Sequence, residues 1–475
     1  IDVRDAYVKA SIILPSGWEY GTALPDAVRS GDRVDFGEVN LETLVDSPLD
    51  CGRYAKHISL WQGDNTQTVL DVFADAPQDL DIPDSILKPY KAVTAQALAL
   101  YGARHWNVYH FLLTLSDTIQ EEGIEHHQSS DNRDSADYMI NADRQSVDGD
   151  LLTHEFSHSW NGKYRRPASL TTTNYQEPMK TDLLWVYEGM NQYLGELLAL
   201  RSGIYDAKKY PDALAYHYAH LDMEPGRLTE PLIDTAVAAP YLYVYEGDYA
   251  SIRRTSGDFY SEGSLLWLDV DTIIREQTHG QKSLDSFEQL FAGPPNTGPM
   301  VVTYTREQVE ELLHQVAPYD WHAFFQTYVY EISPHPPTDE FARAGWRFVY
   351  TSEPNDYIKT AESVYKISNV WYSLGFDLNK DGAVTDVREG SPAWKAGLAI
   401  GAKVLAVDNQ AYDEDVLKYA LTKAEHSTSP ITLLVSNNGW YSTHAMDYHD
   451  GPRYPHLERI KDKPDMLAAI AAPKH

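Results

Sequence analysis

Short apolar runs broken by Gly, Pro and Asp fill roughly the first 80 positions of the chain, and the run over 7–15 is typical of them. This pattern predicts the short strands and turns of a β-sandwich. A helical spacing of apolar positions follows from about Ser85 to Leu100. The β-branched and aromatic run from Trp106 to Leu115 then predicts a further strand.

Helical patterns dominate the middle of the chain up to a proline-rich break. We expect a helix from about Asp150 to Trp160 and a helical lobe over 183–330, in which the run from Glu307 to Leu313 is a clear example. The segment from Ile332 to Thr338 contains three prolines and ends the lobe. A strand-and-helix region followed by a helical lobe is typical of an α+β fold.

Charge and composition narrow the class of protein. Of the 475 residues, 70 are Asp or Glu and 39 are Lys or Arg, which gives a formal net charge of −31. Such a chain would repel the phosphates of a nucleic acid, so we expect no nucleic-acid partner. No run reaches the roughly 18 apolar residues of a membrane helix, so we expect no membrane span and a soluble protein. Cys51 is the single cysteine, which excludes an intrachain disulfide.

The most informative motif is the H-E-x-x-H sequence over 154–158. His154 and His158 are four residues apart and therefore share one face of the predicted helix, where both imidazoles can bind a zinc ion. Glu155 lies beside them, placed to act as general base on a zinc-activated water. The alternative is a solvated helix that carries two histidines by chance.

A catalytic zinc ion usually has three protein ligands and one open position. Residues 159–163 contain no histidine, so the third ligand must lie further along the chain. Glu188 lies in the largely apolar run 183–198, where an unpaired carboxylate would be costly. We therefore predict that Glu188 is the third ligand, in preference to Glu196 of the same run. An exposed helix glutamate is the alternative for Glu188.

These motifs resemble those of the gluzincins, zinc peptidases with a thermolysin-like catalytic domain. The segments 158–167 and 184–189 resemble one branch closely, the glycyl aminopeptidase family, whose members carry a PDZ domain behind the catalytic domain. The resemblance extends along nearly the whole chain. It implies a multidomain α+β protein with an N-terminal β-sandwich remnant, a thermolysin-like zinc peptidase domain and a C-terminal PDZ domain.

An aminopeptidase also needs a carboxylate that binds the free amino group of its substrate. Gluzincin aminopeptidases carry a G-x-x-E motif on an edge strand upstream of the zinc helix, and the segment Gly123 to His126 resembles it. The resemblance therefore implies that Glu125 pairs with the α-ammonium group. The backbone of the same strand would bond the extended peptide. A surface glutamate in an acidic protein is the alternative.

The resemblance further implies a tyrosine that stabilises the oxyanion together with zinc. Tyr260 opens a Y-x-x-G segment before a predicted helix over 265–275, where the family places this tyrosine. The family more often has Glu-Lys where this chain has Ser261-Glu262. Tyr187, next to Glu188, is the rival candidate. A structural role is expected for the basic residues of 163–166.

The last part of the chain is similar to a PDZ domain. The segments 373–376, 384–387 and 391–398 follow one another as carboxylate-binding loop, strand and turn, and Gly401-Ala402 stands where Gly-Asp is usual. The helix expected over 414–424 would form the other wall of a peptide groove. Either the groove binds the carboxyl terminus of a peptide, or the domain braces the catalytic domain.

We predict four regions along the chain: an N-terminal β-rich domain over 1–82, a catalytic domain over 83–345, a PDZ domain over 365–446 and a tail over 447–475. The β-rich domain of the family is longer, so we expect that an amino-terminal portion is missing from this sequence. Any targeting peptide would be lost with it. The compartment stays open between the bacterial cytoplasm and the periplasm.

The resulting functional prediction is a zinc aminopeptidase that removes small N-terminal residues, glycine and alanine, from peptide substrates. The preference for these residues comes from the resemblance alone. Two alternatives stay open: a zinc endopeptidase on the same site, in which Glu125 is scaffold, and a catalytically silent scaffold that binds peptides through its PDZ groove. The intact set of His154, Glu155, His158 and Glu188 disfavours the silent scaffold.

Overall fold

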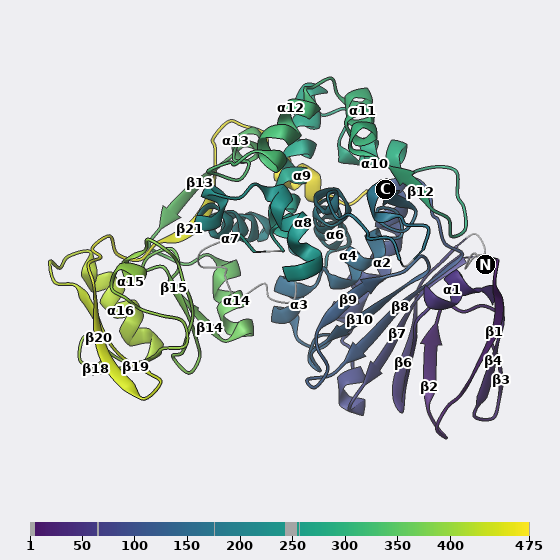
Figure 1. Ribbon diagram of the computed structural model, residues 1–475, viewed down its shortest axis with the longest axis horizontal. Helices are drawn as coiled ribbons and strands as arrows, with labels where there is room; N and C mark the ends of the chain where they lie inside the picture. The colour runs from purple at the N-terminus through teal and green to yellow at the C-terminus, as the bar shows by residue number, and fades with distance from the viewer. Residues whose placement is uncertain (1–4, 64–65, 175, 243–253, 256, 475) are drawn as a thin grey trace. The chain divides into compact units, whose positions relative to one another are not determined.

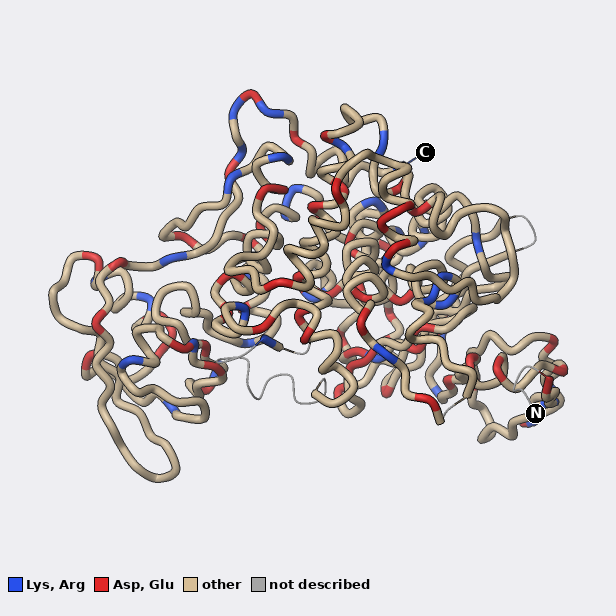
Figure 2. Tube along the Cα trace, turned by 45° about the horizontal axis from the view of Figure 1, so that its top comes forward, with Lys and Arg blue, Asp and Glu red and all other residues tan. Residues whose placement is uncertain are grey.

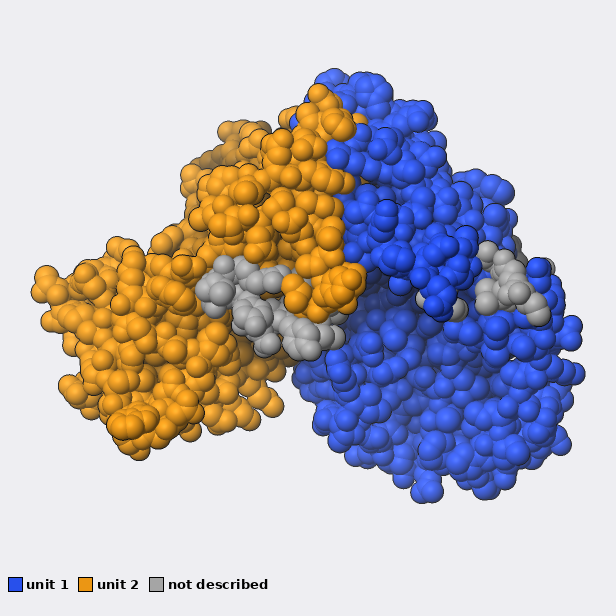
Figure 3. Space-filling view, viewed as in Figure 1, with its two compact units in different colours: residues 1–207, 277–319, 470–475 blue, residues 208–276, 320–469 orange. Residues whose placement is uncertain are grey.

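The computed structural model describes residues 5–63, 66–174, 176–242, 254–255 and 257–474 (Figure 1). The chain folds into two compact units (Figure 3). Unit 1 comprises residues 1–207, 277–319 and 470–475, and unit 2 comprises residues 208–276 and 320–469. Acidic residues are distributed along the whole trace and do not collect in one segment (Figure 2).

A five-stranded mixed sheet forms the centre of unit 1, and its order is β6-β7-β8-β10-β9. β8 runs parallel to both β7 and β10, whereas the edge strand β9 runs antiparallel to β10. Most side chains of β7 and β8 are buried, as expected for central strands that are covered on both faces. The strands span Tyr54–Gly63 (β6), Thr66–Ala74 (β7), Val108–Leu115 (β8), Glu122–Glu125 (β9) and Ser129–Asp134 (β10).

Two smaller sheets form the β-rich start of the chain. Their shared core contains Leu14, Val34 and Phe36. β2 and β5 also contact the central sheet. The elements are β1 (Tyr7–Ile13), β4 (Arg33–Asn40) and β3 (Val28–Ser30) in one sheet, β2 (Glu19–Thr22) and β5 (Leu49–Gly52) in the other, and the short helix α1 (Leu41–Val45).

The helices of unit 1 cover the central sheet, and α4 packs against β9, β10 and α6. A close approach of α4 and α6 depends on Gly195, because a Cβ atom at this position would lie 2.8 Å from the Cα of His154. The helices are α2 (Asp84–Tyr101), α3 (Ala142–Asp148), α4 (Leu151–Ser157), α5 (Leu184–Tyr187), α6 (Gly189–Ser202), α10 (Leu284–Phe291) and α11 (Arg306–Val316). The short strands β11 (Arg165–Pro167) and β12 (Val302–Tyr304) pair in parallel.

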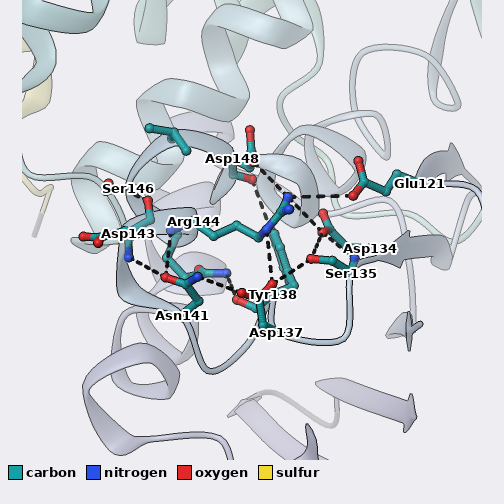
Figure 4. A network of polar contacts seen from close by, with 12 residues as sticks. Glu121, Asp134, Ser135, Asp137, Tyr138, Asn141, Asp143, Arg144, Ser146 and Asp148 are labelled. Atoms are coloured by element: carbon teal, nitrogen blue, oxygen red, sulfur yellow. Dashed lines mark hydrogen bonds and ion pairs between the residues drawn. The ribbon is translucent and has the colours of Figure 1, made fainter. Parts of the chain in front are cut away.

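A polar network around Arg144 fixes the connection from β10 through α3 to α4 (Figure 4). The guanidinium group of Arg144 lies 3.5 Å from Asp134, 3.4 Å from Asp137 and 3.2 Å from Asp148. The side chain of Asn141 caps α3 and accepts hydrogen bonds from two backbone amides of its first turn. The network thereby holds the segment that leads into the H-E-x-x-H helix.

Unit 2 begins with helices whose faces are largely buried, and α9 is buried over most of its length. Its helices in this part are α7 (Tyr210–Asp222), α8 (Leu232–Leu242), α9 (Asp258–Gln277), α12 (Trp321–Phe325) and α13 (Asp339–Arg343). The strands β13 (Trp346–Thr351) and β21 (Tyr454–Arg459) pair antiparallel, and α7 packs on β21. The C-terminal helix α17 spans Met466–Ala471.

The second part of unit 2 contains two small sheets around a separate core, which includes Phe376, Val404, Leu417 and Leu433. The first sheet has the order β14-β15-β16, and the second has the order β18-β17-β19-β20. The strands are β14 (Ile367–Asn369), β15 (Phe376–Asn379), β16 (Val384–Val387), β17 (Lys403–Val407), β18 (Gln410–Ala411), β19 (Ile431–Asn437) and β20 (Trp440–Met446). The helices are α14 (Asp356–Tyr365), α15 (Pro392–Lys395) and α16 (Glu414–Ala424).

The multidomain α+β class expected from the sequence is confirmed. α2 and α16 lie where helices were expected, whereas α4 ends at Ser157, three residues before the expected end. The chain turns there, and the amide of Lys163 bonds back to the carbonyl of His158 at 2.8 Å. Over the residues described, none of the helices has both the length and the apolar character needed to traverse a bilayer.

Candidate metal centre

Three predicted ligands, His154, His158 and Glu188, converge on one point in unit 1. The Nε2 atom of His158 lies 3.1 Å from the Nε2 atom of His154 and 3.1 Å from Oε2 of Glu188. The remaining edge, from His154 Nε2 to Glu188 Oε2, is 3.4 Å. Tetrahedral ligands at the ~2.0–2.1 Å bond lengths of zinc lie about 3.3 Å from one another. The three atoms therefore fit one face of a zinc coordination tetrahedron.

Two helical segments bring these ligands together. His154 is the fourth residue of α4, and His158 is its C-cap residue with helical backbone angles, so both rings project from one face. Glu188 stands between α5 and α6, and its amide bonds to the carbonyl of Leu184 at 2.7 Å. The neighbouring residues Trp185 to Tyr187 are buried, which explains the apolar run around this carboxylate.

A second layer of hydrogen bonds orients His158. Nδ1 of His158 lies 2.9 Å from the carbonyl of Asn161. A carbonyl only accepts, so Nδ1 carries a proton, and the ring that binds a metal would present the lone pair of Nε2. The side-chain amide of Asn161 donates to the carbonyls of Val186 and Tyr187 and so ties the turn after α4 to the segment before Glu188.

The electrostatics of the site favour a cation. Burial opposes the charged form of His158, but Glu188, Glu125 and Glu155 together raise its pKa to about 10. Burial likewise opposes ionisation of Glu188, yet His158 and His154 lower its pKa to about 2. A field that retains a proton on a buried imidazole also stabilises a divalent ion between the same groups. The donor set and the charge thus both fit a metal ion.

Glu155 belongs to the site but not to the ligand triad. Its carboxylate, that of Glu125 and a ring nitrogen of His158 form a second group of possible donors within 4.8 Å of one another. Burial raises the pKa of Glu155 to about 7, against the attraction of His154 and His158. Among the described residues its Oε2 atom has no hydrogen-bond partner. This oxygen is therefore available to a reacting group.

Glu125 ends the edge strand β9 beside the triad. It accepts a hydrogen bond from the hydroxyl of Tyr187. Burial raises the pKa of Glu125, but His158 and Lys163 outweigh this effect and hold it below its ordinary value. In the sequence the nearest glycine, Gly123, precedes Glu125 by two positions, one fewer than the G-x-x-E motif requires. The assignment of Glu125 therefore rests on its position, not on the motif.

The other candidates fall at different places. Tyr260 lies in the first turn of α9 in unit 2, whereas the triad lies in unit 1, so its role stays a prediction. Tyr187, the rival candidate, is in the site, and its ring centroid is 5.0 Å from that of His158. Glu196 lies two helical turns beyond Glu188 and accepts a hydrogen bond from Gln192 at 3.2 Å.

The structure adds residues around the site that local sequence patterns do not reveal. Asp46, from the β-rich start of the chain, pairs with Lys163 at 2.8 Å and accepts a hydrogen bond from the amide of His127 at 2.8 Å. Lys163 thus has the expected structural contact. Its neighbour Arg165 packs over the ring of Phe291, with 4.5 Å between the guanidinium carbon and the ring centroid. No local signal could have identified Asp46, because its contacts are distant in sequence.

A cavity of about 530 Å³ lies next to this ion pair. It is bounded by α1, by the loop after β9 and by the segment 299–303. Asp46 and His127 contribute to its polar wall, and Met300 and Val301 contribute to its apolar wall. The cavity therefore adjoins the end of the edge strand at which Glu125 lies.

This arrangement defines the class of protein: two helix-borne imidazoles, a carboxylate and a separate buried glutamate are the site of a metallopeptidase. The sequence comparisons match two domain models. Residues 148–266 match the family model described as M61 glycyl aminopeptidase, and residues 383–434 match a PDZ domain model. The chain therefore carries a peptidase domain of the M61 glycyl aminopeptidase type, followed by a PDZ domain. No curated protein matches the chain.

One solved structure has a similar fold over nearly the whole chain, and more distant likenesses accompany it. An aminopeptidase N family protein from Idiomarina loihiensis is 18% identical with a TM-score of 0.74, and the alignment covers 98% of this chain and 80% of that protein. An M1 zinc metallopeptidase from Deinococcus radiodurans is 15% identical over 70% of this chain and 65% of its own, with a TM-score of 0.45. Leukotriene A4 hydrolase from Saccharomyces cerevisiae is 13% identical over 69% of this chain and 46% of its own, with a TM-score of 0.41.

Proposed function

We propose that the protein is a zinc-dependent aminopeptidase that removes small N-terminal residues, glycine and alanine, from peptides. His154, His158 and Glu188 would hold the zinc ion. The observation that carries the proposal is the position of Glu125, whose carboxylate lies at the end of an edge strand and within 4.8 Å of donor atoms of His158 and Glu155. A peptide cleaved at this site has its first residue within reach of Glu125.

Each residue has a distinct task in this proposal. Zinc, when bound, polarises the scissile carbonyl and activates water. Glu155 accepts the proton of the attacking water and passes it to the leaving amine. Glu125 binds the α-ammonium group, and the outer edge of β9 pairs with the extended substrate backbone. Tyr260 is proposed to donate a hydrogen bond to the developing oxyanion.

The electrostatic state of Glu125 supports the role of amine anchor. The carboxylate is partly buried, and His158 and Lys163 hold its pKa below the ordinary value, so it stays ionised at neutral pH. Among the described residues, no Lys or Arg forms an ion pair with it. An ionised carboxylate in such a place gains most from a cationic substrate group, because ionic hydrogen bonds are stronger where water is excluded.

The family match supports the proposed residue preference. The matched model describes a glycyl aminopeptidase, and the match includes the zinc helix and Glu188. The test is hydrolysis of a panel of aminoacyl chromogenic amides, from glycyl to leucyl, with and without a chelator. We expect fastest turnover of glycyl and alanyl amides and loss of turnover with the chelator. Equal turnover across the panel would contradict the preference, and chelator-resistant turnover would contradict the zinc mechanism.

Substrates with an acetylated amino terminus separate the two peptidase classes. An aminopeptidase that depends on Glu125 cleaves them poorly, whereas a zinc endopeptidase accepts them because it needs no free amine. Efficient cleavage of acetylated peptides would assign the chain to the endopeptidases. Absence of all hydrolysis by zinc-loaded protein would favour a silent scaffold.

A further inference from the structure

The strand that would receive a peptide in the PDZ domain is paired on both sides. A PDZ domain binds an extended peptide along the free edge of the strand that follows its carboxylate-binding loop. Here that strand is β15, which pairs with β16 on one edge and with β14 on the other. The antiparallel register places Ser368 opposite Leu378, and the amide of Lys380 donates to the carbonyl of Lys366 at 2.9 Å. β14 therefore lies where a ligand strand would add.

The loop that would capture a terminal carboxylate binds a carbonyl of the same chain. The amides of Ser373, Leu374 and Gly375 all donate to the carbonyl oxygen of Val370, at 3.2, 2.8 and 3.1 Å. Converging backbone amides of this kind are what a PDZ loop offers to a peptide carboxylate. The carbonyl of Val370 thus uses donors that an incoming carboxylate would need.

The side chain of Val370 is buried in the apolar core that β15 and α16 share. It is 2% exposed and belongs to the core of the domain. The residues of this core include Leu374, Phe376 and Leu378 of the loop and strand, and Leu417 and Leu421 of α16. An apolar terminal residue of a peptide would require the same space, because side-chain pockets beside the added strand give PDZ recognition its specificity.

The helix that forms the other wall of the groove is linked to the inserted strand. Lys418 of α16 lies 3.2 Å from Glu362 of α14. Glu362 in turn accepts a hydrogen bond from the amide of Asn369, the last residue of β14, at 3.0 Å. This amide points away from β15, so both edges of β14 have partners. Glu362 thereby connects α16 to β14.

We propose that the segment Ile367–Val370 is an internal ligand of the PDZ domain, which fills the peptide groove and excludes external carboxyl termini. The same segment continues directly into a contact with α7. The ring of Trp371 stacks on that of His220 with 5.3 Å between centroids, and the hydroxyl of Tyr372 donates to the carbonyl of Tyr216 at 3.3 Å. The occupied groove therefore braces the domain against a helix of the same unit.

Peptide binding by the intact wild-type chain tests the proposal. The probes are fluorescent peptides that end in valine or leucine with a free carboxylate, and the matched controls are the same peptides with an amidated end. Fluorescence anisotropy is measured with zinc chelated, so that hydrolysis does not interfere. We expect no saturable binding that depends on the free carboxylate. Saturable binding of the free-acid peptides alone would overturn the proposal, whatever the peptidase activity of the protein.

Hydrogen exchange of the peptide-free chain gives an independent test. The amide of Asn379 donates to Ala383, so the preceding amide, that of Leu378, points to β14. We expect this amide to exchange as slowly as amides inside the sheet of β17 and β19. The exposed edge strand β20 supplies the control, because no strand in the described part of the chain pairs with its outward amides. Exchange of Leu378 as fast as these outward amides would mean that the groove is open.

Discussion

At the scale of single residues, two carboxylates of the site, Glu188 and Glu155, differ in their contacts. Glu188 lies between two imidazoles, at 3.1 and 3.4 Å from their Nε2 atoms. Glu155 has a buried oxygen with no hydrogen-bond partner among the described residues, and it lies against Gly123, where a Cβ atom would be 2.3 Å from Oε1. One carboxylate therefore has the contacts of a ligand, and the other has the free oxygen that a general base needs.

Replacement of Glu155 by glutamine should abolish most turnover without loss of metal. The amide keeps the size of the side chain but accepts no proton, and loss of a general base typically costs about 10²–10⁴-fold in rate. Metal content, measured by atomic emission, should equal that of the wild type. Glu38→Gln, at an exposed position of β4, is the control and should leave both unchanged. Near-normal turnover of Glu155→Gln would contradict the assigned role.

A buried glutamate away from the site predicts how stability depends on pH. Burial, reinforced by Asp285, raises the pKa of Glu288 to about 8, despite Arg165. Between about pH 4.5 and pH 8 the unfolded chain has released this proton while the folded chain retains it, so the free energy of unfolding falls as pH rises. Above the pKa of Glu288 in the folded chain, both states are ionised and the free energy of unfolding no longer falls on this account. Glu288→Gln has no carboxyl proton to release, so its free energy of unfolding should fall less steeply with pH.

Thermal unfolding of the variant and the wild type across that pH window measures this difference. A stability change of 1 kcal/mol corresponds to about 2–4 °C in Tm for domains of this size. We expect the Tm of the wild type to fall by several degrees more than the Tm of the variant as the pH rises through this window. Glu311→Gln, at an exposed position of α11, should run parallel to the wild type. Parallel curves for Glu288→Gln would show that Glu288 is ionised in the folded chain.

At the scale of elements, the site depends on how closely α4 and α6 approach. Gly195 of α6 lies against the backbone of His154, and the hydroxyl of Thr153 donates to the carbonyl of Gly195 at 2.8 Å. The side chain of Asn191 donates to the carbonyl of His154 at 2.7 Å. These contacts hold α4, which carries His154, against α6, which follows Glu188.

Gly195→Ala should weaken metal binding and lower the Tm. The added methyl group would lie 2.8 Å from the Cα of His154, a backbone atom, so the helices must separate. Overpacking of this kind typically costs about 1–3 kcal/mol. Metal affinity is measured by competition with a chromophoric chelator. Gly298→Ala is the matched control, because its nearest contact is an ordinary 3.4 Å to a side chain. Unchanged metal affinity in Gly195→Ala would contradict the packing argument.

Sequence patterns predicted elements well where the signal is local. The helix expected over 414–424 has the bounds of α16, and the strand expected over 106–115 contains β8. Pairings between distant strands have no such signal. β6 and β7 lie in the stretch that was assigned to the β-rich start, yet β7 pairs with β8 of the central sheet. Local periodicity does not encode the partner of a strand, which depends on long-range packing.

At the scale of the whole molecule, the convergence of His154, His158 and Glu188 could be predicted, because the two histidines lie in one helical motif and the glutamate lies in a conspicuous apolar run. The Asp46–Lys163 pair could not be predicted, because it joins the β-rich start to the turn after α4. The internal occupation of the PDZ groove was equally hidden. The segment Ile367–Val370 has no distinctive composition, and only the pairing of β14 with β15 reveals it.

The zinc content of the protein tests the assignment of the third ligand. We expect about one zinc ion per chain, as in other three-ligand catalytic sites. Glu188→Ala should retain little zinc and little activity, because it leaves two histidines and an incomplete site. Glu196→Ala, in the same helix region, is the control and should keep zinc. Full zinc content in Glu188→Ala would show that the third ligand is another residue.

The central claim is that Glu125 makes this metallopeptidase an aminopeptidase, and one comparison tests it most directly. Catalytic efficiency of Glu125→Ala is measured on a peptide with a free amino terminus and on its acetylated counterpart, with zinc content as a check. Glu122→Ala, on the same strand but exposed and paired with Arg133 at 3.1 Å, is the matched control. An ionic hydrogen bond of about 1.5–3 kcal/mol predicts a loss of about tenfold to 150-fold. That loss should appear on the free-amine peptide alone, with normal zinc. An equal loss on both peptides would contradict the account, because Glu125 would then support the fold and not the amino terminus of the substrate.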